Sequence, residues 1–217
     1  EAYVFHPGGQ RLTWRQVGEQ VQRVAARLRR EHGLCKGDRL GLLTLGCPEY
    51  VIAYLATVSL GAIAVPVNLG LTAEGLAAQI DKVKARLLVV SPELWAGRLE
   101  AVRDRLPSVQ AVFMTGDQAA TGTLPFAQLD RDGAEAPVHE AIDEWDVCAI
   151  SFTSGTTGVP KGTMAMHINA TGCAQAPWDA WLTLRGLKTL ELRMARHSAS
   201  ALALAEHLAR DARVSRV

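Results

Sequence analysis

Residues 39–66 read RLGLLTLGCPEYVIAYLATVSLGAIAVP, and this stretch decides the fold class. It opens with one short apolar run, Arg39–Thr44, and closes with another, Ala62–Pro66. Between the two runs, Pro48 suits the first turn of a helix that continues to about Leu60. Two apolar strands joined by a helix are typical of a parallel sheet with helices packed on its faces.

The same alternation of helix and strand extends to both sides of this stretch. Thr13 is a suitable N-cap for a helix that runs to about Glu31 and is ended by Gly33. Its apolar residues recur at helical spacing (Val17, Val21, Val24, Ala25 and Leu28), and its arginines Arg23, Arg27 and Arg30 are expected to point outward. We further expect a turn at 36–38, a helix from Thr72 to about Lys84, strands at 86–90, 109–114 and 147–152, and mostly loop at 115–140. The prediction is an α/β fold with a largely parallel sheet flanked by helices.

The bulk composition narrows the class of protein. Apolar residues make up 48% of the chain and charged residues 21%, which is ordinary for a globular protein. The formal charge is only +1, from 23 basic and 22 acidic side chains, so nucleic acid and anionic membranes are not indicated as partners. Ser59, Gly61 and Pro66 interrupt the longest apolar stretch, residues 51–67, which therefore does not predict a membrane span.

The cysteines and the start of the chain carry less information. The 4 cysteines (Cys35, Cys47, Cys148 and Cys173) lie far apart without a Cys-x-x-Cys pair, so no metal site is predicted. Reduced thiols and a cytoplasmic location are expected. Because the chain starts Glu1-Ala-Tyr-Val-Phe, without Met or a signal-like stretch, we expect that it begins inside a longer protein.

Residues 151–163 read SFTSGTTGVPKGT and are the segment most suited to chemistry. Glycines let a loop turn tightly and bring successive N–H groups to an anion, while hydroxyls and a lysine can contact phosphate oxygens. The segment follows a predicted strand, where α/β sheets place ligands. Lys161 is followed by Gly162, so the spacing does not fit the Walker A pattern of ordinary nucleotide triphosphatases. On composition alone, a surface loop without a ligand remains an alternative.

The order of residues in Thr153–Gly162, TSGTTGVPKG, resembles almost letter for letter the phosphate loop of the adenylate-forming superfamily, which includes acyl- and aryl-CoA ligases, luciferases and peptide-synthetase adenylation domains. The resemblance covers about residues 10–170 and includes Leu12–Trp14, Lys36–Asp38, Pro48–Glu49, Gly61–Pro66 and the pair His167 and Asn169. Gly46 and Phe152 depart from the usual Asn and Tyr, outside the implied phosphate contacts.

This resemblance implies a function and a binding site. The β- and γ-phosphates of ATP, bound with Mg²⁺, would be held by Thr153, Ser154, Gly155, Thr156, Thr157, Gly158 and Lys161. The implied reaction is ATP-dependent activation of a carboxylic acid as an acyl-adenylate, with CoA as a further substrate if the enzyme is an acyl- or aryl-CoA ligase. We favour a CoA ligase over a peptide-synthetase module. No catalytic residue is assigned.

Isolated aromatic residues and histidines receive simpler interpretations. His6, His32 and His139 are expected at the surface. Trp14, Trp95 and Trp145 are expected to be packing residues rather than a stacking platform. His167 resembles a position near the acyl site of many relatives, although a histidine on a helix surface explains it equally well.

The last part of the chain resembles a different family. The superfamily's later motifs are absent, and residues 176–190, APWDAWLTLRGLKTL, followed by Leu192–His197, are similar to pyridoxal-phosphate (PLP) enzymes of the cystathionine γ-synthase and γ-lyase type. Lys188 does not match the lysine that binds PLP in that family, so we do not expect PLP to bind. We therefore divide the chain into residues 1–170, an adenylate-forming fragment, and 171–217, a helical fragment. A fused or rearranged reading frame, or a chimera, would explain the junction.

Several expectations follow for the chain as a whole. ATP binding should be weak or absent, and acyl-adenylate formation should not occur, because the adenine-side motifs are missing. The alternatives are a fragment of a PLP enzyme and a non-catalytic nucleotide-binding remnant. One or two amphipathic helices from Pro177 to about Arg210, where only Gly186 interrupts the pattern, would carry an apolar stripe formed by Leu187, Leu190, Leu204 and Leu208. The stripe would pack on the first fragment, pair with another chain or stay exposed, and exposure would favour self-association.

Overall fold

The computed structural model describes residues 3–5, 9–116, 119–131, 133, 138–153, 161–167, 177–211 and 213–214. The chain divides into two compact units, Glu1–Thr171 and Gly172–Val217, and each is described here by itself. The described part of the chain contains no helix that is both long and apolar enough to cross a membrane.

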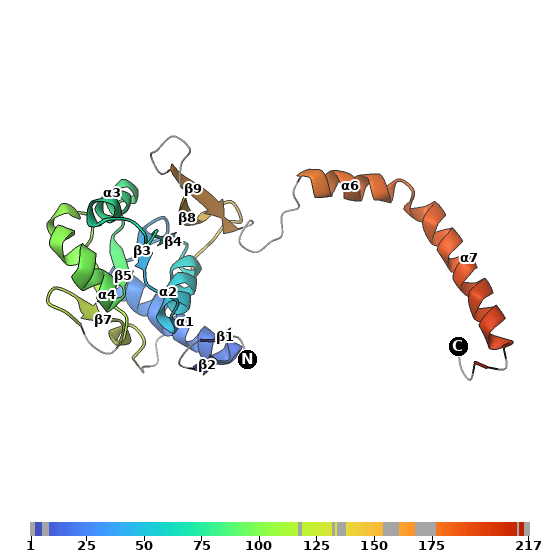
Figure 1. Ribbon diagram of the computed structural model, residues 1–217, viewed down its shortest axis with the longest axis horizontal. Helices are drawn as coiled ribbons and strands as arrows, with labels where there is room; N and C mark the ends of the chain where they lie inside the picture. Colours follow the sequence, from blue (N-terminus) through green and yellow to red (C-terminus); the bar gives the residue numbers. More distant parts are fainter. Residues whose placement is uncertain are drawn as a thin grey trace. The chain divides into compact units, whose positions relative to one another are not determined.

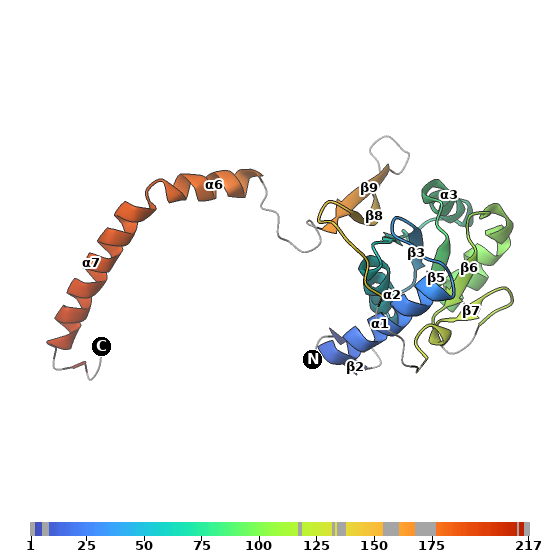
Figure 2. The ribbon, with the colours of Figure 1, turned by 180° about the vertical axis from the view of Figure 1, so that it is seen from behind.

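The first unit is built on a sheet with the strand order β7-β6-β5-β3-β4-β8-β9 (Figures 1 and 2). All neighbouring strands are parallel except β9, which runs antiparallel to β8. The strands are β3 (Arg39–Leu43), β4 (Ile63–Pro66), β5 (Leu87–Val90), β6 (Ala111–Met114), β7 (Leu124–Pro125), β8 (Val147–Thr153) and β9 (Lys161–Met166), with a separate antiparallel pair β1 (Tyr3–Val4) and β2 (Arg11–Leu12). The predicted α/β fold with a largely parallel sheet is confirmed.

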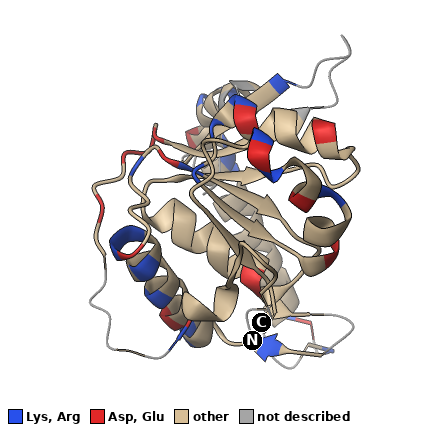
Figure 3. Cartoon of the chain, turned by 90° about the vertical axis from the view of Figure 1, so that its left-hand side faces the viewer, with Lys and Arg blue, Asp and Glu red and all other residues tan. Residues whose placement is uncertain are grey.

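Helices cover both faces of this sheet. One face carries α1 (Trp14–Arg30) and α2 (Pro48–Ser59), which lie side by side, and the other carries α3 (Ala73–Val83) and the helical segment α4–η1–η2 (Figures 1 and 2). That segment consists of α4 (Pro92–Leu94), a π-helical turn η1 (Trp95–Leu99) and a 3-10 helix η2 (Glu100–Arg105). Residues of both charge signs occur mainly on the helices and loops (Figure 3).

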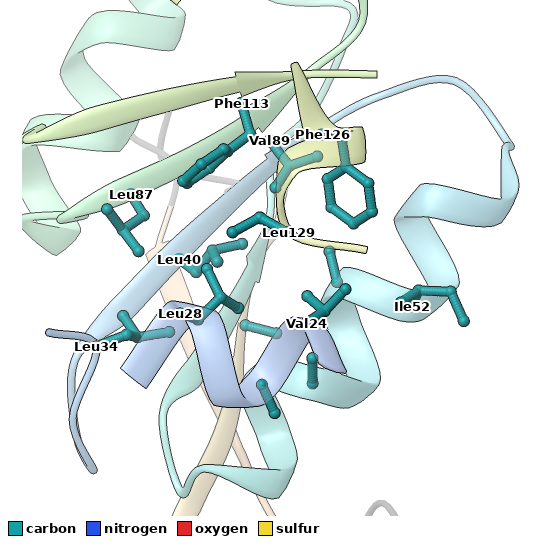
Figure 4. Packing of buried hydrophobic residues seen from close by; sticks show 14 of the residues in the cluster. Val24, Leu28, Leu34, Leu40, Ile52, Leu87, Val89, Phe113, Phe126 and Leu129 are labelled. Atoms are coloured by element: carbon teal, nitrogen blue, oxygen red, sulfur yellow. The ribbon is translucent and has the colours of Figure 1, made fainter. Parts of the chain in front are cut away.

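The strands supply alternate residues to two cores. Leu40, Leu87 and Val89 point toward α1 and α2, where they meet Val24, Leu28, Ile52 and Phe113 (Figure 4). Leu88 and Val90, next to them in the sequence, pack in the second core with residues of α3 and η1. Both faces of the central strands are therefore buried, as their continuous apolar sequence predicted.

The predicted helix starts are confirmed at atomic detail. The Thr13 hydroxyl accepts a hydrogen bond from the Gln16 backbone N–H, and the Gln16 side chain accepts one from the Thr13 backbone N–H, which makes a reciprocal capping box. Thr72 caps α3 through the Gly75 N–H, and Pro48 stands in the first turn of α2.

The expectation that Arg27 points outward is wrong. Its side chain is buried, and its guanidinium donates to the carbonyl oxygens of Leu129 at 3.2 Å and Arg131 at 2.8 Å. Arg23 is half-buried and pairs with Asp130, its Nη2 lying 2.6 Å from Oδ1. These contacts exist because residues 115–140 are more than a loop: β7 and the 3-10 turn η3 (Phe126–Gln128) bring this segment back against α1.

The tryptophan and histidine expectations have mixed outcomes. Trp95 packs in the second core, as predicted. Trp14 is 67% exposed but stands edge-on to Tyr3, and Trp145 is 61% exposed, which does not fit a packing role. His139 is exposed and His6 lies outside the described residues. His32 is not a simple surface residue: its ring stands edge-on to Phe113 with centroids 4.8 Å apart, and burial lowers its pKa against the opposing effect of Glu31.

The described part of the second unit contains two helices, α6 (Pro177–Leu187) and α7 (Leu190–Ala209), where one or two were expected. The break falls at Lys188 and Thr189, just after Gly186. On α6, the rings of Trp178 and Trp181 stack with centroids 5.0 Å apart, and the Arg185 guanidinium lies 5.3 Å from the Trp181 ring centroid.

Candidate functional site

The candidate site lies where β8 ends and β9 begins. Because β8 runs parallel to β4, its carboxyl end is at the same edge of the sheet as the carboxyl ends of β3, β4, β5 and β6. In α/β proteins this edge is where ligands bind. The predicted phosphate-binding segment is thus attached at the edge of the sheet that best suits such a role.

Most of the predicted phosphate contacts lie outside the described residues: Ser154, Gly155, Thr156, Thr157 and Gly158. The two residues that flank them are described. Thr153 is the last residue of β8, Lys161 is the first residue of β9, and the two are register partners. Partners in an antiparallel pair have Cα atoms about 4.5–5.5 Å apart, so residues 153 and 161 are brought together by the backbone alone.

Lys161 is exposed, as a residue that meets a ligand from solution should be. The adjacent Gly162 is opposite Phe152, and a Cβ at Gly162 would lie 3.1 Å from the Ile150 side chain. A larger residue at this position would push against Ile150, which packs on the second core together with Phe152. Gly162 therefore has a structural reason to be small, independent of any phosphate.

His167 lies at the other end of the hairpin from residues 154–160. It follows β9 directly, it is half-buried, and its backbone N–H donates to the Asp146 carbonyl at 3.0 Å. It lines a shallow, mostly apolar depression together with Trp14, Leu55 and Ile142. Its resemblance to an acyl-site position is not tested by these contacts.

Several polar groups at the carboxyl edge were not singled out by the sequence. Thr44 and Ser91 directly follow β3 and β5 and are buried, and a Glu49 carboxylate oxygen accepts from the Gly116 N–H at 3.1 Å. Burial raises the pKa of the Cys47 thiol, which keeps it protonated and poorly nucleophilic. Spacing alone could not show that these side chains lie at one edge, because Thr44, Cys47 and Glu49 follow β3 whereas Ser91 follows β5, more than forty residues later.

No metal centre is formed by the described side chains, since nowhere among them do three or more His, Cys, Asp or Glu residues cluster. By its sequence, the segment 153–161 carries hydroxyls, glycines and a lysine, which are groups suited to contacting phosphate.

The chain is similar in sequence to known AMP-binding enzymes. A family model described as AMP-binding enzyme matches residues 1–194. Crotonobetaine/carnitine–CoA ligase of Salmonella enteritidis PT4 is 32% identical over 161 residues, which are 73% of this chain and 31% of that enzyme. Acetyl-coenzyme A synthetase of Bacillus subtilis is 29% identical over 161 residues, 73% of this chain and 27% of the synthetase.

Solved structures give the same result. The anthranilate CoA ligase AuaEII, in complex with anthranoyl-AMP, is 31% identical with a TM-score of 0.67, over 77% of this chain and 32% of the ligase. The N-terminal domain of FACL13 from Mycobacterium tuberculosis is 27% identical with a TM-score of 0.65, over 76% of this chain and 39% of that domain structure. The chain thus spans about a third of the length of the curated relatives it matches.

The comparisons also bear on the end of the chain. The family match continues to residue 194, past the junction expected near residue 171. The similarity of residues 172–217 to PLP enzymes finds no support in these comparisons.

The register at the site can be tested by a disulfide. We expect Thr153→Cys combined with Lys161→Cys to cross-link readily on oxidation, because partner residues in this hairpin lie within disulfide range. The control is Thr153→Cys with Thr163→Cys, since Thr163 pairs with Ser151 and is displaced by two residues. Non-reducing peptide mapping by mass spectrometry measures the cross-linked fraction of each double variant. Equal cross-linked fractions in the two variants would contradict the register.

Proposed function

Because the chain belongs to the AMP-binding enzyme family, we propose that it is the nucleotide phosphate-binding part of an enzyme that activates a carboxylic acid with ATP. The product is an acyl-adenylate, and pyrophosphate is released. The observation that carries the proposal is the TSGTTGVPKG segment, Thr153–Gly162, whose two ends are held side by side by β8 and β9 at the carboxyl edge of the sheet.

In the proposed reaction the bonds are made and broken in the two substrates, and the protein holds the phosphates. A carboxylate oxygen of the acid attacks the α-phosphorus of ATP, the bond from that phosphorus to the β-phosphate oxygen breaks, and pyrophosphate leaves. Thr153, Ser154, Gly155, Thr156, Thr157, Gly158 and Lys161 hold the β- and γ-phosphates. Their contribution is to fix the phosphates in line for attack and to stabilise the negative charge that gathers on the departing pyrophosphate.

We propose that Mg²⁺ binds together with ATP. The described side chains form no cluster for a resident divalent ion, so the ion is expected to enter bound to the phosphate oxygens. There it neutralises part of the phosphate charge.

The substrate class follows from the relatives. Those compared above are a crotonobetaine/carnitine–CoA ligase, an acetyl-coenzyme A synthetase and an anthranilate CoA ligase, the last with anthranoyl-AMP bound. We propose an acyl- or aryl-CoA ligase, which transfers the activated acyl group to CoA. A peptide-synthetase adenylation domain is the second candidate, and a non-catalytic nucleotide-binding remnant the third.

We also propose that residues 1–170 and 171–217 act as separate parts, in keeping with the two compact units. We propose a cytoplasmic location because the described cysteines, Cys35, Cys47 and Cys148, are free thiols, and thiols stay reduced in that compartment.

The first prediction concerns Lys161. Of the two outcomes expected from the sequence, weak or absent binding, we propose weak binding of pyrophosphate and ATP. We expect Lys161→Ala to weaken it further by about 1.5–3 kcal/mol, or roughly 10- to 150-fold, because a charge-assisted contact is lost. Isothermal titration calorimetry measures the affinities. Lys82→Ala, which removes an exposed lysine from α3, is the matched control. If the Lys161→Ala variant binds pyrophosphate and ATP with unchanged affinity, this segment is not the phosphate-binding site.

The second prediction is that the chain alone does not form acyl-adenylates. It spans about a third of the length of its curated relatives, and loss of positioning groups costs orders of magnitude in rate. We expect no ATP–pyrophosphate exchange above background with acetate, anthranilate or crotonobetaine. A full-length relative serves as the positive control, and robust exchange by the chain would contradict the prediction.

The third prediction concerns the second unit. Leu187, Leu190 and Leu204 are 54%, 40% and 58% exposed, and we propose that α6 and α7 mediate self-association through them. Sedimentation velocity should show a concentration-dependent oligomer that Leu190→Gln with Leu204→Gln reduces, while Ser198→Gln does not. A monomer at every concentration would refute self-association.

A further inference from the structure

The hairpin β8–β9 is joined to the rest of the sheet by a short ladder. Only one register pair, Ala64 with Ala149, is described between β4 and β8. By contrast, four pairs join β3 to β4 and four join β3 to β5. Contacts outside the ladder add further links between this hairpin and the sheet.

Lys36 makes such a contact. It stands in the turn before β3, and its Nζ lies 2.5 Å from Asp146 Oδ2 and donates to the Ala141 carbonyl at 2.8 Å. Asp146 directly precedes β8. In the order β3-β4-β8, the lysine thus reaches from the start of one strand, across the start of β4, to the start of β8. The ion pair therefore links the turn before β3 to the start of β8, in addition to the pairing between β4 and β8.

Gly61 explains why the lysine reaches in this direction. Gly61 stands just before β4 with φ +64°, a conformation that favours glycine, and its carbonyl accepts from the Gly37 N–H at 2.9 Å. A Cβ here would lie 3.0 Å from Lys36 Cγ and 3.3 Å from Cδ. The aliphatic part of Lys36 therefore lies directly over Gly61, where a larger residue would displace it from its contact with Asp146.

Asp146 connects this lysine to both strands of the hairpin. Its carboxylate also accepts from the Asp143 N–H at 2.7 Å, and its carbonyl accepts from the N–H of His167, which follows β9, at 3.0 Å. The hydrogen bond from Lys36 is the main cause that lowers the pKa of the Asp146 carboxyl, which stays ionised at neutral pH. One residue thus ties the start of β8 and the end of β9 to the turn before β3.

We propose that Lys36 is a positioning residue for the phosphate-binding segment: with Gly61 and Asp146, it fixes the base of the β8–β9 hairpin and thereby the positions of Thr153 and Lys161, the two described residues that flank the segment. This inference rests on the proposed function, because it assumes that those residues bind phosphate. Lys36 itself lies at the amino end of β8 and contacts no phosphate.

The contact is suited to orientation rather than to global stability. The side chains of Lys36 and Asp146 are 38% and 26% exposed, and ion pairs with such access to water contribute little to the free energy of unfolding. Thr153 and Lys161 lie at the opposite end of the hairpin from Asp146. A small loss of restraint at Asp146 therefore becomes a larger displacement of those two residues. The free energy of unfolding should therefore change little when the contact is broken, while the hairpin loosens.

The test uses the full chain and three variants. Lys36→Met keeps the length of the side chain but removes its charge, Asp146→Asn removes the partner charge, and Lys36→Arg retains both length and charge. Lys84→Met breaks another exposed ion pair, with Asp81, and serves as the control. Hydrogen–deuterium exchange of residues 147–153 and 161–166, pyrophosphate affinity and the urea midpoint are measured for each.

We expect Lys36→Met and Asp146→Asn to speed exchange in the hairpin by at least ~5-fold and to weaken pyrophosphate binding by roughly 3- to 10-fold, with the urea midpoint nearly unchanged. Lys36→Arg and Lys84→Met should resemble the unaltered chain. If Lys36→Met leaves hairpin exchange or pyrophosphate affinity unchanged, the positioning role is refuted while the proposed function stands. If the unaltered chain binds no pyrophosphate, the proposed function fails first, and the role assigned to Lys36 falls with it.

Discussion

Burial of both faces of the central strands is the constraint on which the rest of this structure depends. Leu87 and Val89 of β5 pack toward α1 and α2, whereas Leu88 and Val90 pack toward α3 and η1. A strand that is apolar on both faces needs cover on both, and helical connections supply that cover only if the strands run parallel. Parallel strands, in turn, bring all their carboxyl ends to one edge. The position of the site is thus a consequence of the core.

The hairpin β8–β9 places the two ends of the proposed phosphate-binding segment at that edge. β8 continues the parallel sheet, and β9 turns back antiparallel, so Thr153 and Lys161 face each other and the intervening residues start and finish at one point. A segment closed in this way loses less conformational entropy when it wraps an anion than an open one would. For a reaction that depends on holding phosphates in place, the position of the hairpin matters as much as the residues it carries. The Lys36–Asp146 contact links that position to the sheet.

Local signals in the sequence predicted much of this fold, and distant contacts account for what was missed. Thr13, Pro48 and Thr72 mark helix starts by chemistry that involves only neighbouring residues, and the structure confirms each. Arg27 was misjudged because the carbonyl groups that bury it belong to Leu129 and Arg131, about a hundred residues away. The strand β9 was not predicted, since KGTMAM has no apolar alternation and is defined by its pairing with β8. The order of residues in Thr153–Gly162 identified the family, but no periodicity could have revealed that Lys36 and Asp146 meet.

The central claim is that the segment between β8 and β9 binds the phosphates of ATP. The most direct measurement is a titration of the isotope-labelled chain with pyrophosphate, followed by NMR of its backbone amides. The account predicts that the largest shifts fall on residues 153–162, with smaller ones at the neighbouring carboxyl ends of β3 and β4. Shifts confined to α6 and α7, or no shifts at millimolar pyrophosphate, would contradict it.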